Sequence, residues 1–276
     1  MKGMVGTSTA RTATVQPHDT LSALPERYAA VREQTERLVR PLSAEDCALQ
    51  SMPDASPAKW HLGHTTWFFE TFVLERAERG FRLFRPEFRV LFNSYYVGVG
   101  ERHPLAERGL LSRPSLEEVC AYRRNVDERM AALLCGPAAP AQAVLALVEL
   151  GLHHEQQHQE LILMDVKHLL SRNPLCPAYR PEEAARGGAS MKGARASQAP
   201  ALHWRAFPEG VRLIGDEGRD FAFDNERPRH RQFVGSFEIA DQLVTAGEYQ
   251  AFIADGGYER PELWLSEGWD VRTAQG

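Results

Sequence analysis

The chain has 276 residues, 43% of them hydrophobic, which is enough for one large domain or two ordinary ones with a substantial core. Its formal net charge is -5, and its 32 basic and 37 acidic residues are mixed along the chain, so no basic stripe is present for binding nucleic acid. No run reaches the ~18 apolar residues of a membrane span, the N-terminus lacks the apolar core of a secretory signal and the four cysteines are widely spaced, which together predict a cytoplasmic protein with reduced thiols and no membrane partner.

The first part of the chain is predicted to be helical. Residues 1–18 are polar and are expected to be disordered, and residues 19–171 are expected to form one domain. Apolar residues recur at helical spacing over Leu24–Val39, which predicts a first helix. A second helix is expected to start at the Ser56–Pro57 pair, with the serine as N-cap, and to end near Gly80.

Two further helices complete this domain. Ser115–Glu118 is a capping-box pattern that begins the third helix, and the fourth is expected to run from near Pro140 to about Ser171. Four long helices predict an up-and-down bundle. The second and third helices are joined by residues 81–114, which are rich in aromatic residues and arginines. Connections this long in a compact domain are often functional.

The composition changes after Ser171. Residues 172–200 combine Pro, Gly, Ala, Ser and charged residues without periodicity, as interdomain linkers do. Residues 201–276 alternate short β-like runs with turns, which predicts the first part of a second, mixed α/β domain. The fold class is therefore expected to be α+β with more than one domain.

Three histidines in the predicted helices are candidate metal ligands. His154 and His158 are four residues apart in a helix, so their side chains lie on one face. That face also carries Gly151 and Asp165 and is expected to point into the bundle, as is the apolar face that carries His64. Three neutral imidazoles on one side of a metal leave positions open for substrates and for dioxygen or water, which is the arrangement of a catalytic site.

Two other histidines and a second motif compete with this hypothesis. His61 and His153 lie off these faces and are expected to be neighbours rather than ligands. The stretch HEQQH, residues 154–158, also satisfies the HExxH pattern of zinc metalloproteases, in which the glutamate is the general base. That chemistry needs a third ligand downstream on a matching helix, whereas Glu182 and Glu183 fall in the expected linker. The protease interpretation is therefore the weaker one.

Several motifs, in the same order along the chain, resemble the ergothioneine-biosynthesis sulfoxide synthases of the EgtB type. They are SPAKWHLGHTTWFFE (56–70), FNSYY (92–96), ERGLLSRPS (107–115), HHEQQHQELIL (153–163) and FDNERPRHRQFVGSFEIADQLVTAGEYQAFIADGGYERPELWLSEGW (223–269). The resemblance covers the chain from about Leu21 onward. It implies an N-terminal DinB-like four-helix bundle, residues 19–171, followed by an incomplete C-type-lectin-like domain similar to formylglycine-generating enzyme, residues 201–276.

The same resemblance implies a mononuclear non-haem iron(II) centre, with His64, His154 and His158 as the ligands by motif position. Such enzymes use O2 to join the sulfur of a cysteine-type thiol, such as cysteine or γ-glutamylcysteine, to the imidazole C2 of hercynine, the trimethylated betaine of histidine. They also oxidise that sulfur to a sulfoxide. Gln157 matches a family position that contacts the hercynine imidazole.

Three further residues are substrate-binding candidates. Because a guanidinium can bind a carboxylate bidentately, Arg108 and Arg113 are candidates for holding the carboxylate of the thiol substrate. Tyr96, with its neighbour Tyr95, is expected to line the pocket.

Several alternatives remain open. A relative that forms a carbon–selenium bond and makes selenoneine has the same architecture. A DinB-like thiol transferase would use zinc or nickel at the same histidines, and imidazole ligands alone do not distinguish these metals from iron. The motifs of residues 223–269 argue against the transferase, because stand-alone members of that group do not need a second domain. In the family that domain continues past the position matching Gly276, so we expect a truncated fragment, half of a split enzyme or an inactive metal-binding module.

Overall fold

The computed structural model describes residues 24–180, 202–218 and 221–275. The stretch expected to be disordered, residues 1–18, and most of the expected linker, residues 181–200, lie outside the described residues. The chain divides into two compact units, Met1–Gly193 and Ala194–Gly276, which are considered separately.

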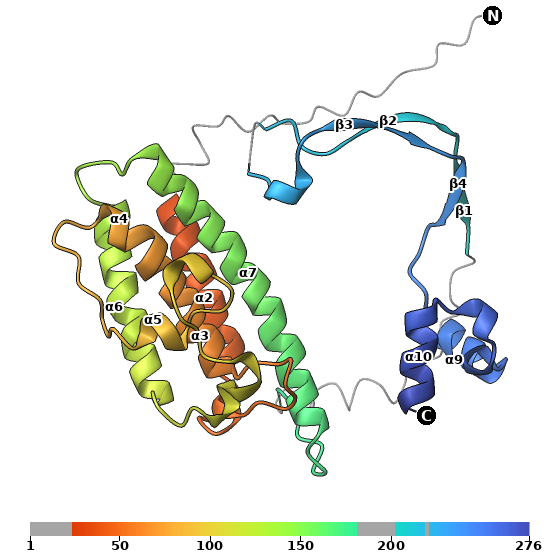
Figure 1. Ribbon diagram of the computed structural model, residues 1–276, viewed down its shortest axis with the longest axis horizontal. Coiled ribbons are helices and arrows are strands. Elements are labelled where there is room, and N and C mark those ends of the chain that lie inside the picture. Colours follow the sequence, from red (N-terminus) through yellow and green to blue (C-terminus); the bar gives the residue numbers. More distant parts are fainter. Residues whose placement is uncertain (1–23, 181–201, 219–220, 276) are drawn as a thin grey trace, which may run out of the picture. The chain divides into compact units, whose positions relative to one another are not determined.

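Four long helical segments build the first unit, as the sequence predicts (Figure 1). Three of them are the single helices α2 (Leu24–Val39), α6 (Leu116–Leu134) and α7 (Gln142–Ser171). The other starts with α3 (Ala58–Phe68) and continues beyond it. The longest helix, α7, packs against α2 and α3, and α6 packs against α3. No helix of the described residues is both long enough and apolar enough to cross a bilayer.

The predicted helix starts are right at α6 and wrong in detail at α3. The Ser115 hydroxyl accepts a hydrogen bond from the Glu118 N–H and the Glu118 carboxylate accepts one from the Ser115 N–H, which is the expected capping box. Pro57, not Ser56, is the N-cap of α3, and no side chain caps it. The Ser56 hydroxyl instead accepts a hydrogen bond from Arg108 at 2.9 Å.

The second helix changes its winding halfway along. After Phe68 it continues as a π-helix, η2 (Phe69–Leu74), and a last turn, α4 (Glu75–Ala77). It therefore ends before Gly80, which lies in the following turn with a φ of +76°. Within η2, the buried Glu70 carboxylate accepts hydrogen bonds from the Tyr122 hydroxyl at 2.6 Å and the Phe84 N–H at 2.8 Å. These bonds tie the π-helix to α6 and to the connection that follows it.

The apolar core lies between the four helices. Its largest fully buried side chains include Trp67, Phe69, Tyr122, Met130 and Leu152. At Gly151 a Cβ would lie 2.6 Å from the Phe69 ring, so a glycine is needed for the close approach of α7 to η2.

A buried charge network joins all four helices. The Glu155 carboxylate on α7 accepts hydrogen bonds from Arg32 at 2.9 Å, Arg123 at 2.7 Å and Thr35 at 2.6 Å. Arg32 on α2 also donates to Thr66 of α3 at 3.0 Å. Burial alone would raise the pKa of Glu155, but Arg123 and Arg32 outweigh it and hold the pKa at about 2. The carboxylate is therefore charged and paired inside the bundle.

The connection over residues 81–114 is held in shape by one buried amide. It contains α5 (Phe88–Leu91) and the short helices η3 (Val97–Val99) and η4 (Leu105–Leu110). The Asn93 side chain donates to three backbone carbonyls of this loop, each at 3.2 Å, and accepts a hydrogen bond from a backbone N–H. These bonds fix the shape of the loop, and a hydrogen bond from Trp60 Nε1 to the Leu91 carbonyl at 3.0 Å holds it beside α3.

The second unit contains strands and helices, so the expected α+β composition is confirmed. Its strands form two antiparallel pairs, β1 (Trp204–Phe207) with β4 (Phe237–Ala240) and β2 (Gly210–Ile214) with β3 (His230–Val234). Trp204 lies opposite Ala240, and Gly210 lies opposite Val234. The helices that follow are α9 (Ala246–Ala254) and α10 (Ser266–Gln275), with η6 (Asp224–Glu226), η7 (Gly257–Glu259) and η8 (Pro261–Leu263) as short 3-10 turns.

Replacing Glu155 tests whether its network stabilises the bundle. Glu155→Gln keeps the side-chain volume but removes the buried carboxylate that Arg32 and Arg123 share, leaving Arg32 with Asp127 alone and Arg123 with the half-exposed Glu36 alone. We therefore expect a loss of roughly 3–5 kcal/mol in the free energy of unfolding. Urea denaturation followed by circular dichroism measures it. Glu160→Gln, at an exposed position of the same helix, is the matched control and should be nearly neutral. Equal stabilities of the two variants would contradict the role of the network.

The unsubstituted chain and the Glu155→Gln variant also allow a test of pH dependence. The folded-state pKa of Glu155 is lowered from 4.5 to about 2, so its stabilising effect is present above the unfolded-state pKa and is lost as the pH falls towards the folded-state value. The stability difference between the unsubstituted chain and Glu155→Gln should therefore be largest at neutral pH and should shrink between pH 4.5 and about 2. Urea denaturation at a series of pH values measures this difference, and a constant difference would contradict the prediction.

Candidate metal centre

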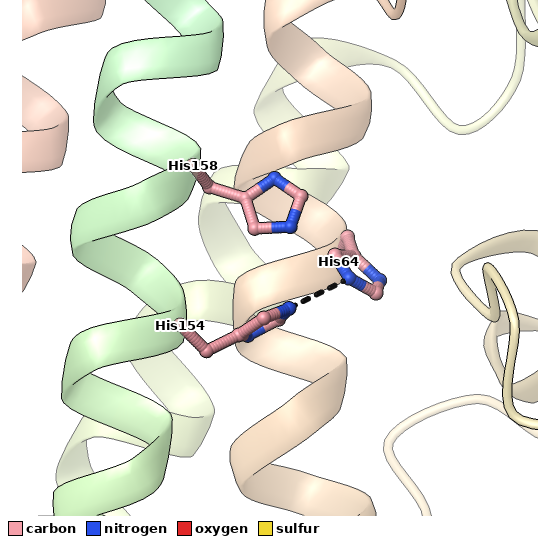
Figure 2. Close-up of side chains that lie close together, drawn as sticks. All are labelled: His64, His154 and His158. Carbon is pink, nitrogen blue, oxygen red and sulfur yellow. Dashed lines mark hydrogen bonds between the residues drawn. The ribbon is translucent and has the colours of Figure 1, made fainter. Parts of the chain in front are cut away.

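Three histidines from two helices converge inside the first unit. Figure 2 shows His64 of α3 beside His154 and His158 of α7, with the rings turned towards one another. One nitrogen from each lies within 4.8 Å of the others. The Nε2 atoms of His64 and His154 are 3.1 Å apart. The structure thus brings together the three residues that the sequence selects as candidate ligands.

The ring of His64 is fixed on both sides and at one end. It stacks on Trp60, with ring centres 4.6 Å apart, and on Trp67, with ring centres 5.5 Å apart. Its Nδ1 lies 2.6 Å from the carbonyl oxygen of Phe92. Because a carbonyl only accepts hydrogen bonds, Nδ1 carries the proton and Nε2 keeps its lone pair. That lone pair is directed at His154.

The three imidazoles are held in the neutral form that metals bind. Burial lowers the pKa of His64 well below its usual range, and the neighbouring imidazole of His154 lowers it further. Burial lowers the pKa of His154 to about 4, and it lowers the pKa of His158 strongly, together with the adjacent His64. Neutral imidazole is the ligand form for zinc, copper, iron and nickel.

The spacing also fits a metal ion. Two nitrogens at right angles around a metal, each at about 2.1 Å from it, are about 3 Å apart. The observed 3.1 Å between His64 and His154 has this value. The third nitrogen, from His158, lies within 4.8 Å of both. The three residues would hold a first-row transition metal through their imidazole nitrogens.

The cluster faces a cavity of about 650 Å³. Besides the three histidines, its lining comprises Asp54, Ser56, Trp60, His61, Ser94, Tyr95, Tyr96, Leu105, Arg108, Gln157, Leu161, Met164 and Asp165. Three of the four substrate-binding candidates are in this set: Tyr96 and Arg108 from the connection between α3 and α6, and Gln157 from α7. The long connection thus contributes to the cavity as its length and composition suggest.

Arg108 is the cation of this cavity. Its guanidinium carbon lies 3.3 Å from the centre of the Trp60 ring, and its NH1 donates to Ser56. Burial lowers the pKa of Arg108 to about 10, so the side chain is still charged at neutral pH. Its Nε has no hydrogen-bond partner within the described part of the chain. A positive charge at the wall of the cavity is suited to binding an anionic group.

The fourth substrate-binding candidate, Arg113, lies outside the cavity. Its side chain is exposed, its NH1 donates to the Ser112 carbonyl at 3.4 Å, and it does not line the cavity. Two arginines five residues apart in one loop look equivalent in the sequence. Only the folded loop separates them, because η4 turns Arg108 inward and ends before Arg113.

The glutamate of HEQQH has no access to the cavity. Glu155 is fully buried on another side of α7, where Arg32 and Arg123 hold its charge. A general base must reach its substrate proton directly or through one water. The zinc-protease interpretation is therefore wrong for this residue.

One member of the site was not expected from the sequence. His61 is buried, and its Nδ1 lies 2.8 Å from the Nδ1 of His158, so it is more than a neighbour. Its Nε2 lies 3.0 Å from the Asp165 carboxylate. The motif WHLGH contained the clue: His61 and His64 are three residues apart, and residues at this spacing lie on the same side of a helix.

Removing a ligand tests the metal centre. His158→Ala is expected to abolish stoichiometric binding of iron(II) and zinc(II), because two imidazoles remain where three converge. Metal content after anaerobic loading and desalting measures this. His168→Ala, on the same helix but bonded to Ser51, is the matched control and should keep full metal content. Unchanged loading of His158→Ala would contradict the ligand assignment.

Known proteins with similar sequences agree with the motifs. Residues 27–162 match the DinB superfamily. Three curated relatives bear the name hercynine oxygenase. The protein from Mycolicibacterium thermoresistibile is 29% identical over 260 residues, which cover 92% of this chain and 54% of the relative. The proteins from Mycolicibacterium smegmatis and Mycobacterium tuberculosis are each 30% identical, over 92% and 90% of this chain and 55% and 54% of their own lengths.

The chain spans about half the length of the curated relatives it matches. The similarity extends over both structural units, since it covers 92% of the chain. The resemblance inferred from the motifs is confirmed: residues 27–162 match the DinB superfamily, and the chain is similar to proteins named hercynine oxygenase over about half of their length.

Proposed function

We propose that this chain provides the metal-binding domain and part of the second domain of an iron(II)- and O2-dependent sulfoxide synthase that acts on hercynine. One observation supports this most directly. Three neutral histidines converge at the wall of a cavity that also holds Arg108 and Gln157, in a chain related to hercynine oxygenases. Imidazole ligands suit zinc as well as iron, so the choice of iron rests on the resemblance.

The proposed reaction balances with one molecule of O2. The imidazole C2–H of hercynine and the S–H of a cysteine-type thiol are lost, and a C–S bond forms between the two substrates. One oxygen atom of O2 is transferred to the sulfur, which becomes a sulfoxide. The other oxygen leaves as water with the two hydrogens. When bound, the iron would supply the site at which O2 accepts electrons from the thiol and the imidazole.

Residues of the chain would position the two organic substrates. Arg108 would bind the carboxylate of cysteine or γ-glutamylcysteine, because its guanidinium is charged and faces the cavity. Gln157 would hydrogen-bond the hercynine imidazole from α7, one residue before the ligand His158. The aromatic side chain of Tyr96 is half-buried against Trp67, with ring centres 5.5 Å apart, and would form the apolar wall.

The second unit would belong to a C-type-lectin-like domain of the kind found in formylglycine-generating enzyme. Its two antiparallel strand pairs and its later helices are compatible with such a mixed domain. Strand residues such as Trp204 (60% exposed) and Phe237 (46% exposed) leave much apolar surface uncovered within this unit. Further polypeptide of the same domain would cover these side chains.

Turnover tests the proposed function. Anaerobic iron(II) loading followed by addition of hercynine, γ-glutamylcysteine or cysteine, and O2 is expected to yield a sulfoxide detectable by mass spectrometry. The assay is run with the 276-residue chain and with any longer product of the same open reading frame. Retention of zinc in preference to iron, with no sulfoxide from either protein, would favour a DinB-like thiol transferase instead.

The two arginines of the loop form a matched pair for substrate binding. Arg108→Gln is expected to raise the KM for the thiol substrate by roughly 10- to 100-fold, as expected for loss of charge-assisted hydrogen bonds worth about 1.5–3 kcal/mol. Arg113→Gln should leave the KM unchanged, because that side chain does not line the cavity. Steady-state kinetics at saturating hercynine measure both. Equal KM values for the two variants would contradict the assignment of Arg108.

A further inference from the structure

A histidine and a carboxylate lie behind the candidate ligand His158, on the side away from the other ligands. The Nδ1 atoms of His61 and His158 are 2.8 Å apart, and both rings are buried. Two ring nitrogens at this distance share one proton, so one ring donates and the other accepts. Which ring donates decides whether the remaining nitrogen of His158 is free to bind a metal.

The other end of His61 settles the direction. Its Nε2 lies 3.0 Å from Oδ2 of Asp165, and the same oxygen accepts the backbone N–H of Ser56 at 2.9 Å. A carboxylate that already accepts a backbone N–H is an acceptor for His61 too, so Nε2 of His61 carries a proton. A neutral imidazole has one N–H and one lone pair, on different nitrogens. The Nδ1 of His61 is therefore the acceptor.

This assignment of His61 determines the tautomer of His158. Its Nδ1 must carry the proton that His61 accepts, which leaves its Nε2 with a lone pair. In Figure 2 one nitrogen of the His158 ring is directed at His64 and His154, while the other points away from them. Nδ1 is the one that contacts His61, so the nitrogen directed at the cluster is Nε2.

We propose that His61 and Asp165 are positioning residues that hold His158 in the Nδ1–H tautomer and so present its Nε2 to a bound metal. This inference rests on the proposed metal centre and names the residues that prepare one of its ligands. Hydrogen bonds from the outer nitrogen of a ligand histidine to such partners fix the tautomer and the ring orientation. His64 is prepared by a backbone carbonyl, whereas His158 depends on two side chains that substitution can change without altering a ligand.

The tautomer can be observed without metal and without substitution. In the metal-free 276-residue chain labelled with ¹⁵N-histidine, long-range ¹H–¹⁵N spectra distinguish protonated from bare ring nitrogens. We expect His158 to be protonated at Nδ1 and bare at Nε2, and His61 to be protonated at Nε2. The His158→Ala and His61→Asn spectra assign the two signals. A His158 ring protonated at Nε2 would overturn the inference.

Paired substitutions test the effect on metal affinity. His61→Leu removes the acceptor, whereas His61→Asn can place an amide oxygen near the position of Nδ1. Asp165→Leu and Asp165→Asn form the second pair, since the Ser56 N–H keeps an acceptor oxygen in place in the asparagine variant. We expect each leucine variant to bind cobalt(II) and zinc(II) roughly 10- to 100-fold more weakly. Each asparagine variant should recover much of the affinity.

Competition titrations give the affinities, and thermal unfolding of each metal-free variant shows whether it is folded. If the unsubstituted chain binds metal but the folded leucine and asparagine variants have equal metal affinities, the positioning role is overturned. The metal centre itself is not contradicted by that result. An unsubstituted chain that binds neither metal would overturn the metal centre itself. If a leucine variant does not fold, the tautomer in the unsubstituted chain still decides the inference.

Discussion

The first unit depends on neutralising one carboxylate inside its bundle. Glu155 lies between the two candidate ligands of α7 in the sequence, and its charge is met by Arg32 of α2 and Arg123 of α6. Successive residues of a helix point about 100° apart, so fixing Glu155 on one side directs His154 and His158 to another. A rotation of α7 would leave a buried charge without its partners, which is costly. The ion network thus sets the orientation of the face that carries His154 and His158.

The second constraint is the connection between α3 and α6, which shapes the opposite side of the site. Its Phe92 carbonyl fixes the tautomer of His64, and its Asn93 side chain holds the following turn through four hydrogen bonds. The same segment then supplies Tyr96 and Arg108 to the cavity. One continuous stretch of backbone therefore fixes the orientation of the candidate ligand His64 and lines the cavity beside it.

In the described part of the chain, the charged groups around the three clustered histidines are held by other partners and are not hydrogen-bonded to their imidazoles. The three clustered imidazoles are neutral because burial lowers their pKa values. The cation of the cavity is Arg108, which stacks on Trp60 instead of contacting the imidazoles. The carboxylate of Asp165, which also lines the cavity, is bound to His61 and to the Ser56 N–H. A metal ion held by these histidines would therefore add a second positive charge to the wall of the cavity, besides that of Arg108.

Local sequence patterns determined the helices of the first unit, the capping box at Ser115 and the three clustered histidines, because helical periodicity places residues three and four apart on one face. Only the tertiary structure decided contacts between distant segments. It separated Arg108 from Arg113, assigned the Ser56 hydroxyl to Arg108 instead of a helix cap, and brought Asp165 to His61 across 104 residues of sequence. Periodicity fixes the face on which a side chain lies, whereas its partner depends on which helices pack together.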